Sequence, residues 1–190
     1  MKNIIILGPS RVGKSTISSI LCTKYILNYI SGDSIRNAFI NIYPNLGYTT
    51  KNTIEKVDFC KFIEWLIKEN NIHLKRDIYY VIDSTDISLD NALKIFDNSI
   101  IIALGCKDSS IHDMVKKMKE NDIKLDWTYG YNDNELYDIA NETINNSKKL
   151  YEKCLSNNVI YFDTSVDRYK TYAEILKYIE KEFVESNLEI

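Results

Sequence analysis

The residues whose chemistry is easiest to interpret lie near the start of the chain. Eight consecutive residues form a loop that carries two glycines, a lysine and a serine: Gly8, Pro9, Ser10, Arg11, Val12, Gly13, Lys14 and Ser15. This spacing lets successive backbone N–H groups surround a phosphate chain at the N-terminus of a helix. Lys14 is then expected to reach the β- and γ-phosphates, and the Ser15 hydroxyl to bind Mg²⁺. The loop is a complete Walker A motif and, with Thr16 behind it, predicts an ATP site.

The residues on either side of this loop supply the elements that must position it. Residues 4–7 are a short β-branched apolar run, which is typical of a buried parallel strand. Ile17, Ile20 and Leu21 follow the loop at helical spacing. We therefore expect a strand that runs through the loop directly into a helix.

A second group of polar residues, Ser31, Gly32, Asp33 and Arg36, follows the apolar run at 27–30. In this segment the chain resembles the P-loop nucleoside monophosphate kinases, adenylate kinase above all, whose second strand ends in a similar Ser/Thr-Gly-Asp-x-x-Arg sequence. The resemblance implies that Ser31, Asp33 and Arg36 bind the acceptor, and that Arg36 holds an anion with its guanidinium fork.

The resemblance leaves two chemical roles open for Asp33. In related kinases that phosphorylate a hydroxyl, an aspartate at this place is the general base; in the nucleotide kinases it helps to hold Mg²⁺-bound water. A structural alternative is that Asp33 or Ser34 only caps a helix over residues 35–42.

A third signal is the acid that ends the apolar run at 79–82. Asp83 is the first acid after this run, which is the Walker B pattern for holding Mg²⁺ directly or through water. Asp86 is the weaker metal candidate, because it could cap a helix over residues 87–96. The expected catalytic residues are therefore Lys14, Asp33 and Asp83, with Ser15 and Asp83 at the metal.

In the resembling kinases, the segment that corresponds to residues 107–132 is a lid that closes over ATP and supplies catalytic arginines. This chain has four arginines, Arg11, Arg36, Arg76 and Arg168, and none lies between residues 77 and 167. The cations of the lid-like segment are lysines at positions 116, 117, 119 and 124, which either neutralise phosphate as point charges or form a solvated face. Trp127 and Tyr129 either stack on a substrate ring or pin the lid to the body.

The last candidate lies after the fifth apolar run. The resemblance places the loop over residues 163–168 against the adenine, so that Arg168 stacks on the base. His73 and His112 are isolated in the sequence and are expected at the surface.

Composition limits the classes of partner and compartment. The net charge of −3 argues against nucleic acid as the main partner. Cys22, Cys60, Cys106 and Cys154 are far apart and form no CxxC pair, so reduced, mostly buried thiols are expected. No apolar stretch has the length of a signal peptide core or a membrane span, and we expect a cytoplasmic protein that binds no membrane. The oligomeric state is left open.

The elements that must hold these residues alternate between strand and helix. Strands are predicted at 4–7, 27–30, 78–82, 99–104 and 159–162, and helices at 53–69, 134–156 and 169–183. This alternation predicts one α/β domain over residues 1–190 with a parallel sheet covered on both faces. The resemblance implies a three-layer α/β/α P-loop fold with strand order 2-3-1-4-5, an acceptor-binding insert at 33–76 and the lid at 107–132.

These observations predict an ATP-dependent phosphotransferase that moves the γ-phosphoryl group of MgATP to a small acceptor, preferably a nucleotide-like phosphate. The alternatives are a kinase for a hydroxyl-bearing metabolite with Asp33 as general base, a nucleotide-binding regulator or slow NTPase without an acceptor, and a nucleic-acid-end kinase. The arginine-free lid favours the regulator, and the acidic net charge opposes the last class.

Overall fold

Five strands form one parallel sheet with the order β2-β3-β1-β4-β5 in the computed structural model, which describes residues 1–124 and 126–188. The strands are β1 (Asn3–Leu7), β2 (Asn28–Ser31), β3 (Tyr80–Ser84), β4 (Ser99–Gly105) and β5 (Tyr161–Asp163). All four strand pairs are parallel, and β1 at the centre pairs with β3 and β4. The expected fold class and strand order are confirmed.

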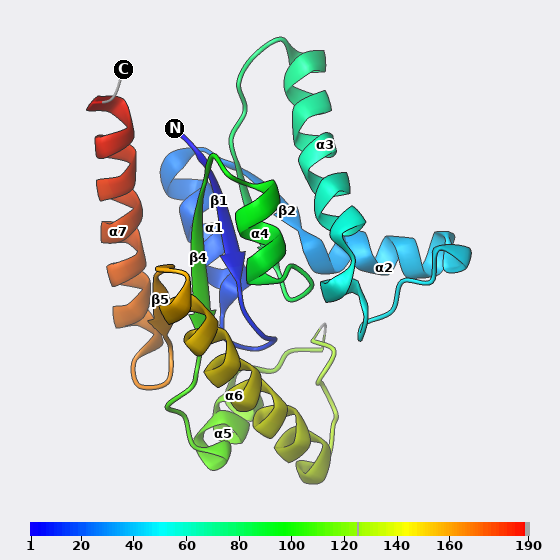
Figure 1. Cartoon of the computed structure of the whole chain (residues 1–190). Coiled ribbons are helices and arrows are strands. Elements are labelled where there is room, and N and C mark those ends of the chain that lie inside the picture. The colour runs from blue at the N-terminus through cyan, green and yellow to red at the C-terminus, as the bar shows by residue number, and fades with distance from the viewer. Residues whose placement is uncertain (125, 189–190) are drawn as a thin grey trace.

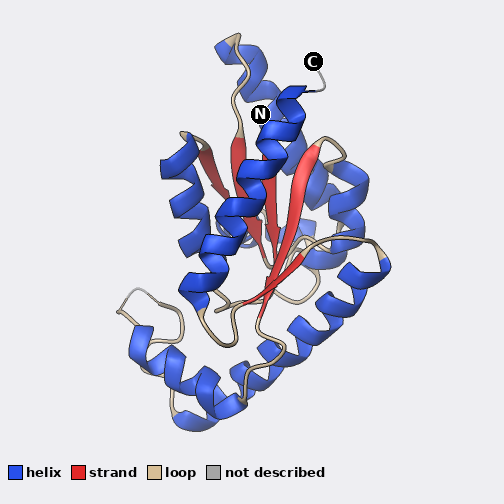
Figure 2. Ribbon diagram, turned by 90° about the vertical axis from the view of Figure 1, so that its left-hand side faces the viewer, coloured by secondary structure: helices blue, strands red, loops and turns tan. Residues whose placement is uncertain are grey.

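Seven α-helices lie on both sides of the sheet and beyond its carboxyl ends in the described residues (Figures 1 and 2). They are α1 (Lys14–Tyr25), α2 (Gly32–Ile42), α3 (Val57–Leu74), α4 (Leu89–Ile95), α5 (Ile111–Asn121), α6 (Asp133–Ser156) and α7 (Arg168–Leu188). Two 3₁₀ turns, η1 (Pro44–Leu46) and η2 (Thr53–Glu55), lie between α2 and α3.

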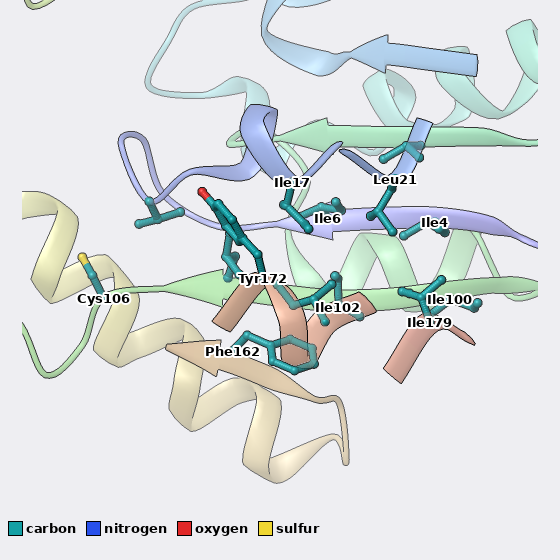
Figure 3. Close-up of a cluster of buried hydrophobic side chains, with 14 of the residues drawn as sticks. Ile4, Ile6, Ile17, Leu21, Ile100, Ile102, Cys106, Phe162, Tyr172 and Ile179 are labelled. Atoms are coloured by element: carbon teal, nitrogen blue, oxygen red, sulfur yellow. The ribbon is translucent and has the colours of Figure 1, made fainter. Parts of the chain in front are cut away.

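The central strand divides the core into two hydrophobic clusters. Because side chains alternate along a strand, Ile4 and Ile6 pack in the cluster that contains α1 and α7, while Ile5 and Leu7 pack in the cluster that contains α3 and α4. Figure 3 shows Ile6 beside Ile17 of α1 and Ile4 beside Leu21 of the same helix. All four β1 side chains are at most 1% exposed, which anchors the strand that leads into the Walker A loop.

The structure excludes two alternative capping roles, and this bears on function. The N-cap of α2 is Ser31, whose Oγ accepts the backbone N–H of Ser34 at 3.2 Å, so neither Asp33 nor Ser34 caps this helix. The helix after β3 begins at Leu89 with Ser88 as its N-cap, and Asp86 has no capping role. Both carboxylates are thereby left for other contacts.

Two of the differences between predicted and observed boundaries lie close to the site. The helix expected at 53–69 is split, because Thr53–Glu55 forms a 3₁₀ turn and α3 begins at Val57. Strand β3 starts two residues later than expected and continues through Asp83 and Ser84, where Asp83 pairs in register with Ile6 of β1. The Walker B acid therefore lies within the sheet, beside the end of β1.

The remaining elements gather around the carboxyl ends of the strands. Helix α5 and the N-terminal part of α6 lie beyond these ends, and α2 and α3 lie to one side (Figure 1). Among the described residues, no helix is long and apolar enough to cross a membrane.

Candidate active site

The Walker A loop has the backbone geometry of a phosphate cradle. Gly8 and Gly13 have φ of +154° and +94°, and a Cβ at Gly8 would lie 2.1 Å from the carbonyl oxygen of Leu104. Gly13 is also the N-cap of α1 and has no side chain to occupy the first free N–H groups of that helix. These N–H groups are therefore available to an anion.

Lys14 is buried at the centre of this cradle. It is 6% exposed, and its Nζ donates a hydrogen bond to the carbonyl of Pro9 at 2.8 Å. Burial lowers the pKa of Lys14, although the negative charges of Asp33, Asp83 and Asp86 act in the opposite direction. Three carboxylates thus face one buried cation.

Two side chains of helix α7 brace the loop. The Tyr172 hydroxyl donates to the carbonyl of Gly13 at 3.0 Å, and the Arg168 guanidinium donates to the carbonyl of Arg11 at 3.1 Å. These bonds place Arg168 beside the backbone of the Walker A loop, and its stacking on the base stays a prediction.

A cavity of about 430 Å³, which we call the donor cavity, opens over the loop. It is lined by residues of the loop and α1 (Ser10, Arg11, Gly13, Lys14, Ser15, Thr16), by Asp33, by α5 residues (Met114, Lys117, Met118, Asn121), and by Asp126, Trp127 and Arg168. Seven of the ten residues expected to bind ATP therefore meet in one space. The side chain of Val12 is instead fully buried in the core, and Gly8 and Pro9 line a neighbouring cavity.

That neighbouring cavity, of about 960 Å³, we call the acceptor cavity. Its walls come from the end of β1, from α2, from η2 with the preceding loop, from the segment after β3 and from α6. Ser10, Asp33 and Trp127 line both cavities. Asp33 therefore lies at the junction of the two cavities.

The surroundings of Asp33 keep its carboxylate ionised. Its Oδ1 accepts the Thr85 hydroxyl at 2.9 Å and the Thr85 N–H at 3.3 Å, and lies 3.7 Å from the Arg36 guanidinium. Burial acts to raise the pKa of Asp33, but the charge of Lys14, the Thr85 bonds and the charge of Arg36 outweigh it and lower the pKa.

Asp83 lies deeper, between β1 and β2. Its carboxylate is buried and accepts hydrogen bonds from the Ser18 hydroxyl at 3.2 Å and the Tyr29 hydroxyl at 3.1 Å. Burial raises the pKa of Asp83 despite Lys14 and the bonds from Tyr29, Ser15 and Ser18. A divalent cation near this carboxylate would favour its ionised form.

The Ser15 hydroxyl and the Asp83 carboxylate are hard oxygen donors of the kind that Mg²⁺ takes. The described residues contain no group of three or more His, Cys, Asp or Glu side chains able to hold a metal alone. Magnesium in phosphoryl-transfer sites is typically bound by one or two protein oxygens together with phosphate and water, so this donor set fits the metal expected from the sequence.

The fork of Arg36 is engaged within the protein. One terminal nitrogen lies 2.6 Å from the Asp86 carboxylate, and the other nitrogens donate to Oδ1 of Asn37 at 3.2 Å. The Arg36 and Asp86 side chains are 13% and 4% exposed. Burial raises the pKa of Asp86 to about 6, with Arg36 lowering it and Asp33 raising it. Ser31, the third expected acceptor ligand, caps α2 and lines neither cavity.

The lid-like segment contributes to the site in ways that the sequence did not indicate. Of its lysines, Lys117 lines the donor cavity and donates to the carbonyl of Ser165, whereas Lys116 and Lys119 pair with exposed acids. Arg11 forms ion pairs with Asp122 and Asp126 of this segment. The signal in the sequence for this contact was the pair of acids Asp122 and Asp126, in a segment where arginines were expected.

The remaining expectations concern isolated residues. The four cysteines are free thiols, and three of them are buried. His73 and His112 are exposed, as expected.

No protein-family model matches the chain, and no curated protein matches its sequence. Solved structures do match its fold. A shikimate kinase from Bacteroides thetaiotaomicron aligns with a TM-score of 0.56 at 12% identity, covering 95% of this chain and 99% of that one. A gluconokinase from Sinorhizobium meliloti 1021 aligns with a TM-score of 0.56 at 13% identity, covering 97% of each chain.

A shikimate kinase from Acinetobacter baumannii in complex with shikimate aligns with a TM-score of 0.51 at 14% identity, covering 96% of this chain and 94% of that one. The similarity extends over 94% or more of each compared chain. The chain therefore has the adenylate kinase-like fold of the P-loop small-molecule kinases.

Proposed function

We propose that the protein transfers the γ-phosphoryl group of MgATP to a hydroxyl group of a small metabolite, with Asp33 as the general base. The observation that carries this proposal is the position of Asp33, whose ionised carboxylate lines both the donor cavity and the acceptor cavity. A carboxylate at that junction is placed to take the proton of an acceptor hydroxyl as it attacks.

The donor side is built for charge neutralisation and positioning. The loop N–H groups and Lys14 bind the phosphate chain, and α7 fixes the loop backbone through Tyr172 and Arg168. Ser15 and Asp83 would hold Mg²⁺, which when bound neutralises charge on the β- and γ-phosphates.

The acceptor side supplies the proton acceptor. The Thr85 bonds and the Arg36 contact are all made to Oδ1 of Asp33, so proton transfer falls to Oδ2. The hydroxyl proton moves to Asp33, the acceptor oxygen forms a bond to the γ-phosphorus, and the bond from that phosphorus to the β–γ bridging oxygen breaks. ADP leaves with that oxygen, and Asp33 returns its proton to solvent.

Two observations move our preference from a nucleotide-like acceptor to a hydroxyl acceptor. The guanidinium fork of Arg36, which was expected to hold the acceptor phosphate, is engaged by Asp86 and Asn37. The compared structures are named as kinases of shikimate and gluconate, small hydroxyl-bearing metabolites, and they give no support to a nucleotide acceptor.

The test is ADP release from MgATP in the presence of small hydroxylated metabolites, nucleosides and nucleoside monophosphates. We expect a hydroxylated metabolite to stimulate ADP release, and Asp33→Asn to lower kcat with that acceptor by about 10²–10⁴-fold, the range for a lost general base. Asp58→Asn, a change at an 80% exposed carboxylate on α3, is the matched control and should leave kcat unchanged.

Two results would contradict the proposal. Stimulation by nucleoside monophosphates alone, with little effect of Asp33→Asn, would assign a phosphate acceptor. ATP hydrolysis that no acceptor stimulates would assign a slow NTPase or a nucleotide-binding regulator.

A further inference from the structure

The P-loop and the lid-like segment are joined by ion pairs in which the lid supplies the negative charge. The Arg11 guanidinium contacts the Asp122 carboxylate and lies 3.2 Å from the Asp126 carboxylate. The Arg11 and Asp122 side chains are 14% and 11% exposed, so the first pair is only weakly screened by water and salt. This arrangement ties the described part of the lid to the phosphate-binding loop.

Both carboxylates are held in place by neighbouring groups of the lid. Asp122 accepts the hydroxyl of Thr128 at 2.7 Å, and Thr128 is fully buried. Asp126 accepts the N–H of Ile123 at 3.1 Å through its side chain and the N–H of Tyr129 at 3.0 Å through its carbonyl. The two acids are therefore preorganised for Arg11, which reduces the entropy lost when the ion pairs form.

The backbone of Arg11 is also fixed in position within the Walker A loop. Its φ is +65°, a left-handed conformation that a non-glycine residue keeps only where surrounding contacts enforce it. Its carbonyl accepts the hydrogen bond from Arg168. The lid acids are thus anchored to a fixed point of the nucleotide site.

Trp127 follows Asp126 directly and lines both the donor cavity and the acceptor cavity. Its ring is 6.0 Å from that of Tyr131 in an edge-on contact, and the residue is 54% exposed. The position of this large apolar side chain therefore depends on how firmly the neighbouring acids hold Arg11.

We propose that Arg11, Asp122 and Asp126 form a clasp that fixes Trp127 as the wall between the two cavities. Trp127 is then a positioning residue that orients the acceptor and keeps water away from the transferred phosphoryl group. This inference rests on the proposed function for the meaning of the two cavities. It also assigns the Arg11 side chain to the lid and leaves phosphate binding at this position to the backbone N–H.

The two tryptophans of the chain make the clasp measurable without any assay of activity. Trp65 lies on α3 and lines neither cavity, so Trp65→Phe leaves Trp127 as the single reporter. In this background, acrylamide quenching of Trp127 fluorescence is measured on the nucleotide-free protein. The test variants are Arg11→Gln, Asp122→Asn and their combination; Asp122→Asn keeps an acceptor oxygen for Thr128.

We expect each single change to raise the quenching constant by up to about twofold, because the exposed fraction of Trp127 moves from 54% towards full exposure. The combined variant should show no rise beyond that of Arg11→Gln, since Arg11→Gln already breaks the contact that Asp122→Asn removes. Glu120→Gln is the matched control on α5, because its partner Lys116 lies 3.9 Å away at the surface, and quenching should not change. Arg11→Lys, which keeps the charge without the fork, should give an intermediate value.

The second readout is the ratio of acceptor-independent ATP hydrolysis to acceptor phosphorylation. Loss of the clasp should raise this ratio by about 2- to 5-fold, the change that a partly exposed ion pair makes to a closed-to-open equilibrium. Unchanged quenching in correctly folded Arg11→Gln, Arg11→Lys and Asp122→Asn proteins would overturn the clasp. Increased quenching with an unchanged ratio would overturn the role of Trp127. A failure of the proposed function would instead appear as the absence of acceptor stimulation, whatever the quenching result.

Discussion

The ion pair between Arg36 and Asp86 allows a prediction in which the size of the effect follows from the structure. In Arg36→Gln, the buried Asp86 loses its cation. Breaking a buried pair typically costs about 3–5 kcal/mol, because an uncompensated charge is left inside the protein. Asp86 can avoid this cost by taking up a proton.

The pKa of Asp86 determines the free-energy cost of protonating this side chain. Because that pKa is already about 6 in the presence of Arg36, holding Asp86 protonated at pH 7 costs about 1.4 kcal/mol, one pH unit above the pKa. At pH 5 the group is mostly protonated in both proteins. The remaining loss is then that of the contacts with Asn37 and Thr85, about 1 kcal/mol.

The sign follows from proton linkage. The folded pKa of Asp86 is raised above its ordinary value, so its contribution to stability is complete below about pH 4 and is lost as the pH rises through about 6. Without Arg36, the folded pKa rises further and the loss extends to higher pH. The stability difference between wild type and Arg36→Gln should therefore be near 1 kcal/mol at pH 5 and grow by about 1.4 kcal/mol per pH unit above 6, up to the 3–5 kcal/mol limit.

Urea denaturation at pH 5, 6, 7 and 8 measures this difference directly. Arg76→Gln, a change at an exposed arginine after α3, is the matched control and should be independent of pH in this range. A stability difference below 0.5 kcal/mol at pH 8 (about the scatter of neutral surface changes), with a raised acceptor KM, would refute this reasoning. Arg36 would then be a ligand of the acceptor, as the sequence suggested, and not the counter-ion of Asp86.

Two further predictions concern the donor side. Lys14→Ala should abolish turnover and weaken MgATP binding, because it removes the buried cation of the phosphate cradle. The rise in thermal midpoint that MgATP produces in wild type should also be lost, whereas unchanged turnover would exclude the Walker A loop as the working site. Asp83→Asn should lower kcat sharply with the fold intact, and ATP binding measured without Mg²⁺ should be nearly unaffected. Equal losses of ATP binding with and without the metal would indicate a structural role for Asp83.

The local pattern of the sequence determined the fold and the donor half of the site. The Walker A loop needs only its own glycines, the strand before it and the helix after it, and all of these are contiguous over residues 3–25. Strand positions were predictable because the buried parallel strands are short β-branched runs. The strand order followed from the resemblance, and the structure confirms it.

Only the tertiary structure decided the partners of the charged residues. Arg36 meets Asp86 across 50 positions of the chain, and Arg11 meets Asp122 across 111. The guanidinium fork of an arginine matches a phosphate and a carboxylate equally well, so the residue type does not determine which of the two it binds. Which anion each arginine contacts depends on where folding places the segment after β3 and the lid. No local sequence pattern predicts a contact between residues so far apart in the chain. The side-chain partners of Arg36 and Arg11 could therefore not be predicted from the sequence, while the roles expected of Lys14 and Ser15 follow from the loop that contains them.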